Sequence, residues 1–265
     1  MTDQPVQPAL FIPHGGGPCF FMDDPLGTWT EMGDFLRALP TTLPAPPKAI
    51  LLVSAHWESD GFAFTSGDRP PLLYDYYNFP PHTYQLRYDA PGAPALAARA
   101  ADMLRAAGLI AGLDADRGYD HGVFIPLKVS WPDAEIPVVE MSLDRSLDPG
   151  LHLAAGRALA PLREENVLIV GSGMSFHNLR SLGDPAATDP SRRFDDWLGN
   201  AAAQMPSERD RQLTQWASAP AARASHPREE HLIPLMVAAG ASSGQGHRIF
   251  NGLVTGTMIS GFRFD

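Results

Sequence analysis

The 265-residue sequence has little cysteine and no cluster of basic residues. Its only cysteine is Cys19, which excludes internal disulfides, a CxxC redox pair and a thiolate zinc cluster. A metal ion would therefore need histidine and carboxylate ligands. Lys and Arg number 20 against 30 Asp and Glu, for a net charge of −10. Without a basic run, the chain lacks the clustered cations that nucleic-acid binding requires, so we expect no nucleic-acid partner.

Long apolar runs are also missing. No segment approaches the ~20 apolar residues that cross a bilayer, so we expect no membrane partner. The polar segment Met1–Pro8 has neither a basic nor an apolar signal-peptide region, and we therefore expect a cytoplasmic protein. No repeat, flexible linker or charge block divides the chain, which predicts one domain over residues 1–265.

Short apolar runs alternate along the chain with segments of helical character. The strands are expected at Ala9–Ile12, Ala49–Ser54, Gly61–Thr65, Leu109–Leu113, Pro137–Leu143, Val167–Val170 and within His247–Phe264. The helices are expected at Leu26–Leu39, Ala93–Ala107, Asp148–Arg163, Ser191–Gln204, Glu208–Trp216 and Pro234–Ala239. This alternation predicts a three-layer α/β/α domain with a mixed central sheet, in which the late strands add antiparallel edges.

Three of the nine histidines follow predicted strands. His14 comes after Ala9–Ile12, His56 after Ala49–Ser54, and His177 after Val167–Val170 through a Gly-Ser-Gly turn. Ligands of open α/β sheets bind outside the carboxyl ends of the strands, so these side chains could share one crevice. The alternative for each is an ordinary solvated or hydrogen-bonded loop histidine.

Two further histidines, His121 and His231, lie in polar loops that lead into apolar segments. Pro234 argues against a helix that runs through His231. The aromatic segment Tyr74–Pro80 has two interpretations, a loop anchored by its rings or a lid over an aromatic ligand.

Six segments in this order resemble the class III extradiol ring-cleavage dioxygenases, in particular their DOPA 4,5-dioxygenase-like branch. They are Pro13-His14-Gly15 with Pro18, Ser54 to Trp57, Tyr74 to Pro80, Asp116 to Pro126, Gly171 to Asn178, and His226 to Leu235. Together they extend over most of the chain.

The resemblance implies a non-haem metal centre with His14, His56 and His231 as ligands. It assigns His121 and His177 to catalysis, with His177 also a candidate fourth ligand. The protocatechuate-type enzymes use a glutamate as third ligand, whereas this sequence has His231 with Glu229 and Glu230 beside it. A carboxylate in the ligand set favours Fe(II), while an all-histidine set also suits Zn(II). Tyr77, Phe79 and Asp120 are the expected substrate contacts.

The implied reaction is cleavage of a catechol, DOPA or a related small aromatic diol, by O₂ to a muconic semialdehyde. Fe(II) is the expected cofactor of the active enzyme. Two alternatives are a zinc-dependent hydrolase and a non-catalytic metal-binding relative of the same fold. His121 and His177 argue against the second, because a binding module does not need proton-transfer groups.

Overall fold

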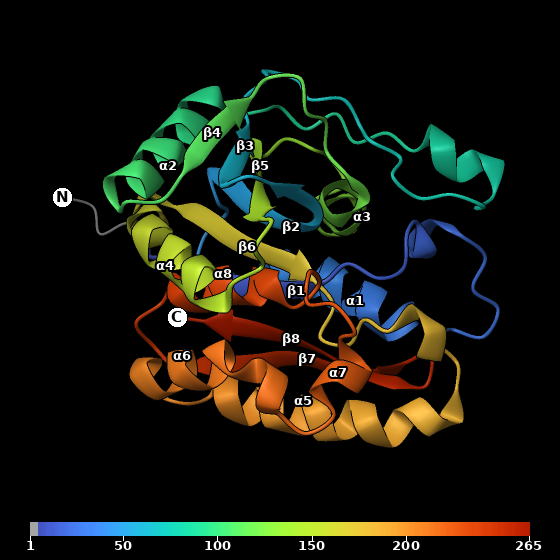
Figure 1. Cartoon of the computed structure of the whole chain (residues 1–265). Coiled ribbons are helices and arrows are strands. Elements are labelled where there is room, and N and C mark those ends of the chain that lie inside the picture. Colours follow the sequence, from blue (N-terminus) through green and yellow to red (C-terminus); the bar gives the residue numbers. More distant parts are fainter. Residues whose placement is uncertain (1–4) are drawn as a thin grey trace.

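The computed structural model describes residues 5–265, so part of the Met1–Pro8 segment lies outside the described residues. Within these described residues, eight strands form one sheet in the order β4-β3-β5-β2-β6-β1-β8-β7 (Figure 1). The strands are β1 (Ala9–Pro13), β2 (Ala49–Ser59), β3 (Phe62–Thr65), β4 (Ala111–Asp114), β5 (Val138–Asp144), β6 (Val167–Gly173), β7 (Gly246–Val254) and β8 (Thr257–Phe264).

The sheet is mixed, as predicted. Its centre consists of the parallel neighbours β5, β2, β6 and β1. The late strands β8 and β7 extend it through antiparallel pairing. At the opposite edge of the sheet, β3 pairs antiparallel with β5 and parallel with β4.

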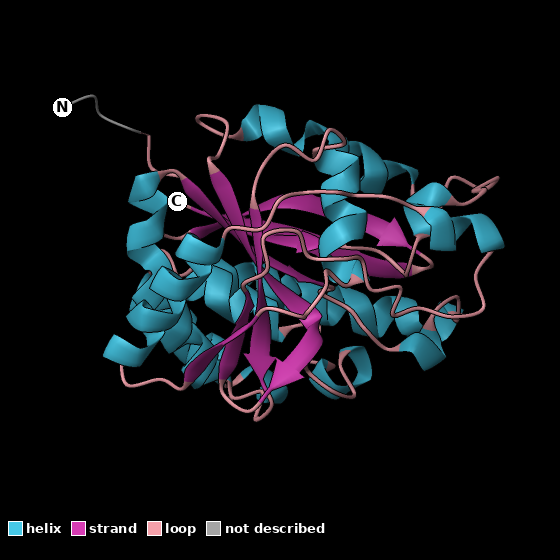
Figure 2. Cartoon of the chain, turned by 90° about the horizontal axis from the view of Figure 1, so that it is seen from above, coloured by secondary structure: helices cyan, strands magenta, loops and turns pink. Residues whose placement is uncertain are grey.

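Helices cover both faces of this sheet (Figure 2). They are α1 (Thr30–Ala38), α2 (Pro94–Ala106), α3 (His121–Ser130), α4 (Pro149–Leu159), α5 (Thr188–Ala202), α6 (Pro206–Thr214), α7 (Ala222–Ser225) and α8 (Ile233–Gly240). Side chains alternate along β2: Leu51 and Val53 join the core beneath α2, α4, α5 and α8, whereas Ile50 and Leu52 join the core beneath α1 and α3. The predicted three-layer α/β/α architecture is therefore confirmed.

Two predicted strand ends were wrong, and both lie near the histidines. Strand β2 continues five residues beyond Ser54, so His56 lies within the strand and not after it. The pairing of β2 with β5 changes register between Val53 and Glu58, a stretch that begins at the end of the apolar run. Likewise, Gly171, Ser172 and Gly173 belong to β6 and form no turn. An apolar run thus marks only the doubly covered part of a strand.

Helix α3 was not predicted. Nearly all of its side chains are buried, so it lacks the apolar–polar period that reveals a surface helix. Pro126 lies inside it and weakens the helical signal further. Helix α8 begins at Ile233 with Pro234 in its first turn, and so does not include His231, as Pro234 predicted. Among residues 5–265, no helix is both long and apolar enough to cross a membrane.

Candidate active site

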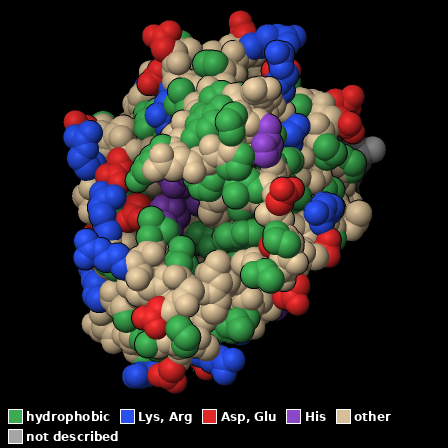
Figure 3. Space-filling model, turned by 90° about the vertical axis from the view of Figure 1, so that its right-hand side faces the viewer, with side chains coloured by type: hydrophobic (Ala, Val, Ile, Leu, Met, Phe, Trp, Pro, Cys, Tyr) green, Lys and Arg blue, Asp and Glu red, His purple; other side chains and the backbone are tan. Residues whose placement is uncertain are grey.

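Five histidines meet at the carboxyl ends of the parallel strands. His14 follows β1, His56 lies in β2, His121 begins α3, His177 follows β6 and His231 precedes α8. All five line one cavity of about 500 Å³. Figure 3 shows histidine side chains inside a hollow whose surroundings are largely hydrophobic. The fold thus brings together the strand-associated histidines and the two loop histidines of the sequence.

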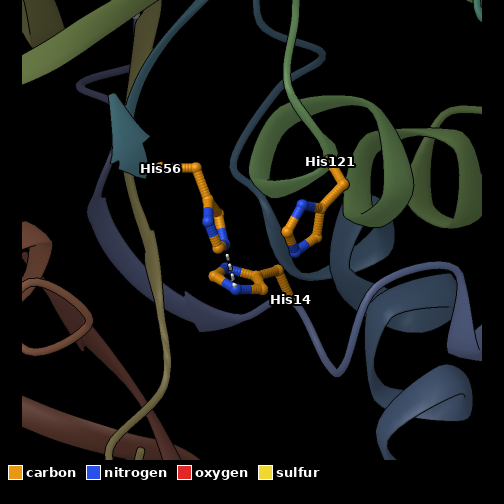
Figure 4. Close-up of side chains that lie close together, drawn as sticks. All are labelled: His14, His56 and His121. Atoms are coloured by element: carbon orange, nitrogen blue, oxygen red, sulfur yellow. Dashed lines mark hydrogen bonds between the residues drawn. The ribbon is translucent and has the colours of Figure 1, made fainter. Parts of the chain in front are cut away.

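His14, His56 and His121 point toward one another (Figure 4). The Nε2 atoms of His14 and His56 are 3.1 Å apart. The ring centroids of His56 and His121 are separated by 3.9 Å. One donor atom from each ring lies within 4.8 Å of the others, a spacing at which three imidazoles can hold one ion.

Ser172 determines which nitrogen of His14 is free. Its hydroxyl donates to the carbonyl oxygen of Gly122 at 2.5 Å and lies 3.1 Å from His14 Nδ1. Because a hydroxyl has one proton, Ser172 Oγ must accept a hydrogen bond from His14 Nδ1–H. The lone pair of His14 is therefore on Nε2, which faces His56.

Asp75 holds His121 in the same manner. Its Oδ1 accepts hydrogen bonds from the backbone N–H and from Nδ1 of His121, both at 2.9 Å. Its other oxygen lies 3.7 Å from His56 Nδ1. Burial favours a raised pKa for Asp75, but the contacts with His121 and His56 lower that pKa overall. Sequence reasoning did not select Asp75, although it lies in the aromatic segment Tyr74–Pro80.

Glu230 links the remaining two histidines. Its Oε1 lies 2.9 Å from His231 Nδ1 and 3.1 Å from His177 Nδ1. The rings of His177 and His231 stack with their centroids 3.3 Å apart. His231 is also next to the first group, with ring centroids 4.8 Å from His56 and 5.2 Å from His14. Glu229, by contrast, pairs with Arg223.

The buried rings of the cluster are held neutral. Burial, followed by the nearby histidines, lowers the pKa of His14 and of His231 well below its usual range. Burial and the neighbouring His121 lower the pKa of His56 to about 4. For Glu230, burial acts to raise the pKa, but the hydrogen bond with His177 lowers it overall. His14, His56 and His231 therefore present neutral imidazoles, and Glu230 lies beside His231 as a carboxylate.

The residues present fit a divalent ion. Outer nitrogens held by Ser172, Asp75 and Glu230 leave the Nε2 atoms for the site, the arrangement that supports histidine ligands in metalloproteins. An all-imidazole donor set suits Fe, Zn or Cu. The geometry forms two donor groups, His14–His56–His121 and His177–Glu230–His231.

The predicted substrate contacts are divided by the structure. Tyr77 and Phe79 line the cavity. Asp120 is fully buried behind it, where it accepts hydrogen bonds from Ser54 Oγ at 2.7 Å and from Arg117 at 3.0 Å. Tyr76 has its ring against Phe124 and donates its hydroxyl to a backbone carbonyl. The contacts of Tyr76 fit a loop anchored by its rings, whereas the lid over an aromatic ligand stays a prediction.

Glycines in β6 allow the segment that carries His231 to lie directly on the sheet. A Cβ atom at Gly173 would be 2.1 Å from the carbonyl oxygen of His231, and one at Gly171 would be 2.3 Å from that of Pro234. The backbone N–H of Met174 then donates to the His231 carbonyl at 3.0 Å. The glycines therefore allow one backbone segment to lie directly against another.

Known proteins are similar to this chain in sequence and in fold. The family model described as the catalytic LigB subunit of aromatic ring-opening dioxygenase matches residues 8–262. A protein of Hapsidospora irregularis named dioxygenase tasH is 39% identical, over 91% of this chain and 80% of its own length. The 4,5-DOPA dioxygenase extradiol of Escherichia coli K12 is 37% identical, over 90% of this chain and 86% of its own.

The same name belongs to a Beta vulgaris protein that is 36% identical, over 91% of this chain and 89% of its own length. The crystal structure of an uncharacterized Escherichia coli K12 protein superposes with a TM-score of 0.78 and 30% identity, covering 98% of this chain and all of that one. These matches favour ring-cleaving chemistry over zinc-dependent hydrolysis and over a non-catalytic role. The chain accordingly belongs to the LigB family of aromatic ring-opening dioxygenases and is an extradiol dioxygenase.

Proposed function

We propose that this chain acts as one catalytic domain, residues 1–265, which cleaves a catechol with O₂ next to its hydroxyls and releases a muconic semialdehyde. The observation that carries this proposal is the position of the five histidines in one cavity bordered by aromatic side chains. Such a cavity can hold a planar diol with its oxygens toward the histidines. DOPA and related catechols are the candidate substrates.

His14, His56 and His231 are the proposed metal ligands. His14 and His231 are buried and His56 is partly buried. All three have a lowered pKa, so each imidazole offers a lone pair without first losing a proton. Fe(II) is the proposed ion, and Zn(II) is the rival. The ion would act as a Lewis acid that favours ionisation of the catechol hydroxyls.

His177 and His121 are the proposed proton-transfer groups. Glu230 accepts from Nδ1 of His177 and Asp75 from Nδ1 of His121, which leaves each Nε2 to exchange protons with the substrate. We assign to His177 the role of general base for a catechol hydroxyl. His121 positions the substrate and returns a proton during ring opening.

Oxygen consumption tests the proposed reaction. The protein is reconstituted with Fe(II) or with Zn(II) under argon and then mixed with oxygen and a panel of catechols that includes DOPA. We expect oxygen uptake and a yellow semialdehyde with Fe(II) only. Turnover with Zn(II) but not with Fe(II) would contradict the proposed metal, and lack of turnover with either would contradict the proposed reaction.

The roles of the histidines are separated by measuring metal content and turnover together. His14→Ala, His56→Ala and His231→Ala should each abolish stoichiometric metal binding. His177→Ala and His121→Ala should keep the metal and lose about 10²–10⁴-fold in kcat. The control is His247→Ala, because His247 is exposed in β7; it should keep both the metal and the turnover.

Two results would change the assignment. Full metal content in His231→Ala together with metal loss in His121→Ala would make His121 the third ligand, in line with its place beside His14 and His56. Metal loss in His177→Ala would make His177 a ligand.

A further inference from the structure

The cavity around the histidines has an apolar wall. Apart from the histidines and Gly15–Gly17, it is lined by aromatic and aliphatic side chains and by two threonines; the larger apolar ones include Trp29, Phe79, Phe176, Leu182, Val254 and Ile259. Of the described residues that line this cavity, none is Lys, Arg, Asp or Glu. Away from the histidines, a bound molecule would therefore meet mainly carbon surface.

Three of the other polar side chains of the wall are already hydrogen-bonded within the protein. The Tyr76 hydroxyl donates to the carbonyl oxygen of Thr83 at 2.6 Å. The hydroxyls of Thr255 and Thr257 both donate to the carbonyl oxygen of Val254, at 2.8 and 3.0 Å. These groups leave little capacity to solvate a charged substituent.

A second pocket beside this cavity contains a guanidinium group, that of Arg228, which already forms an ion pair with Glu58. This second pocket, of about 460 Å³, shares His56, His177 and His231 with the first and is also lined by Arg228. Arg228 donates to both carboxylate oxygens of Glu58, at 2.6 and 2.7 Å, and lies 3.7 Å from Glu230. A substrate carboxylate at Arg228 would lie beside the carboxylates of Glu58 and Glu230, whose negative charges disfavour its binding.

We infer that the preferred substrate is an uncharged catechol with an apolar alkyl or aryl substituent, and not an amino acid such as DOPA. This inference rests on the proposed ring cleavage. A cavity of about 500 Å³ falls in the ~300–1,000 Å³ range of sites for drug-sized ligands, which leaves room beyond one ring. Burial of apolar carbon is favourable, whereas an ammonium or carboxylate buried without a partner is strongly disfavoured.

Binding under argon tests the inference without turnover. The dissociation constants of 4-methylcatechol, 4-butylcatechol, DOPA and 3,4-dihydroxyphenylpropanoate are measured by calorimetry on the Fe(II)-loaded protein. Affinity should rise about fourfold for each added methylene. DOPA and the propanoate should bind more weakly than 4-butylcatechol, by about 100-fold where the charge is fully buried.

A charged residue placed in the wall should change this preference. Leu182 lines the cavity and is 42% exposed, so Leu182→Arg can be accommodated. It should improve binding of the propanoate about tenfold, because an ionic hydrogen bond becomes available, and weaken binding of 4-butylcatechol. Leu113→Arg, at a site of 47% exposure in the edge strand β4, is the matched control and should change neither constant.

The outcomes separate this inference from the proposed function. Binding of DOPA as tight as that of 4-butylcatechol, or tighter, would overturn the inference, and loss of DOPA binding in Arg228→Met would then identify the adjacent pocket as the reason. Preferential binding of 4-butylcatechol without oxygen uptake for any catechol would support the inference and overturn the proposed reaction. Failure of every catechol to bind would overturn both.

Discussion

Ser172 orients His14, one of the proposed metal ligands. It accepts from Nδ1 of His14 and donates to the Gly122 carbonyl, which orients the His14 ring and selects its tautomer. Ser172→Ala removes this acceptor, and loss of such a partner typically lowers metal affinity about 10–100-fold. Competition with a chelator of known affinity measures the change.

Ser142→Ala is the control for that substitution. Ser142 is fully buried in β5, where its hydroxyl accepts from the backbone N–H of Ala63 at 2.8 Å. We expect a comparable loss of stability and unchanged metal affinity. If both variants lose metal affinity equally, the effect comes from general loosening of the protein and not from the His14–Ser172 contact.

The contact between β6 and the segment before α8 is the clearest case of an element that positions a site residue. A methyl group at Gly173 would overlap the carbonyl oxygen of His231, and backbone cannot rotate away as a side chain can. Gly173→Ala should therefore cost about 1–3 kcal/mol of unfolding free energy and also weaken metal binding.

Gly112→Ala provides the comparison within another strand. A Cβ atom at Gly112 in β4 would meet nothing within 4 Å, so stability and metal content should change little. Denaturant titration and metal analysis of both variants measure the two effects. Normal metal content in a folded Gly173→Ala protein would show that His231 tolerates displacement of its backbone.

The segment Tyr74–Pro80 contacts both the proposed catalytic residue His121 and the cavity. Asp75 binds His121, while the neighbouring Tyr77 lines the cavity and is 79% exposed. Tyr77→Ala should raise KM or change the preference among catechols, since an aromatic face is lost, and metal content should stay at the wild-type level. Unchanged steady-state kinetics for every catechol would assign Tyr77 no part in binding.

The protein as a whole should be sensitive to acid through buried histidines outside the cavity. His152 uses both ring nitrogens: Nδ1–H donates to the Asp148 carbonyl, and Nε2 accepts from the Asp144 N–H. Burial lowers the pKa of His152, and lowers that of His226 to about 4. Both residues are therefore neutral in the folded state at pH values where the unfolded chain is protonated.

These lowered pKa values determine whether the stability of the fold rises or falls with pH. Stability is complete above the ordinary histidine pKa of ~6.5 and falls as the pH decreases toward 4, because the unfolded state binds more protons. The slope is about 1.4 kcal/mol per pH unit for each such group. Denaturant titrations between pH 7 and 4 measure it, and the double variant His152→Gln/His226→Gln should show a shallower slope. An equal slope in both proteins would contradict this origin of the acid sensitivity.

Local sequence patterns were sufficient to predict the architecture and the approximate position of the site. Apolar runs such as Val167–Val170 and the Ala-rich segment that became α2 are local signals, because backbone hydrogen bonding and burial act on neighbouring residues. Their alternation predicted the three layers and the mixed sheet. The ordered histidine segments predicted the family, and the comparisons confirmed it.

Tertiary packing decided the features that have no local signal. Helix α3 is buried on nearly all sides, and β2 extends past its apolar run to include His56, so neither follows from periodicity. The partners of the site histidines are far away in the chain: Ser172 is 158 residues from His14, and Glu230 is 53 residues from His177. Such pairs form only when segments that are far apart in the chain fold against each other, because hydrogen bonds depend on distance in space and not on separation in sequence.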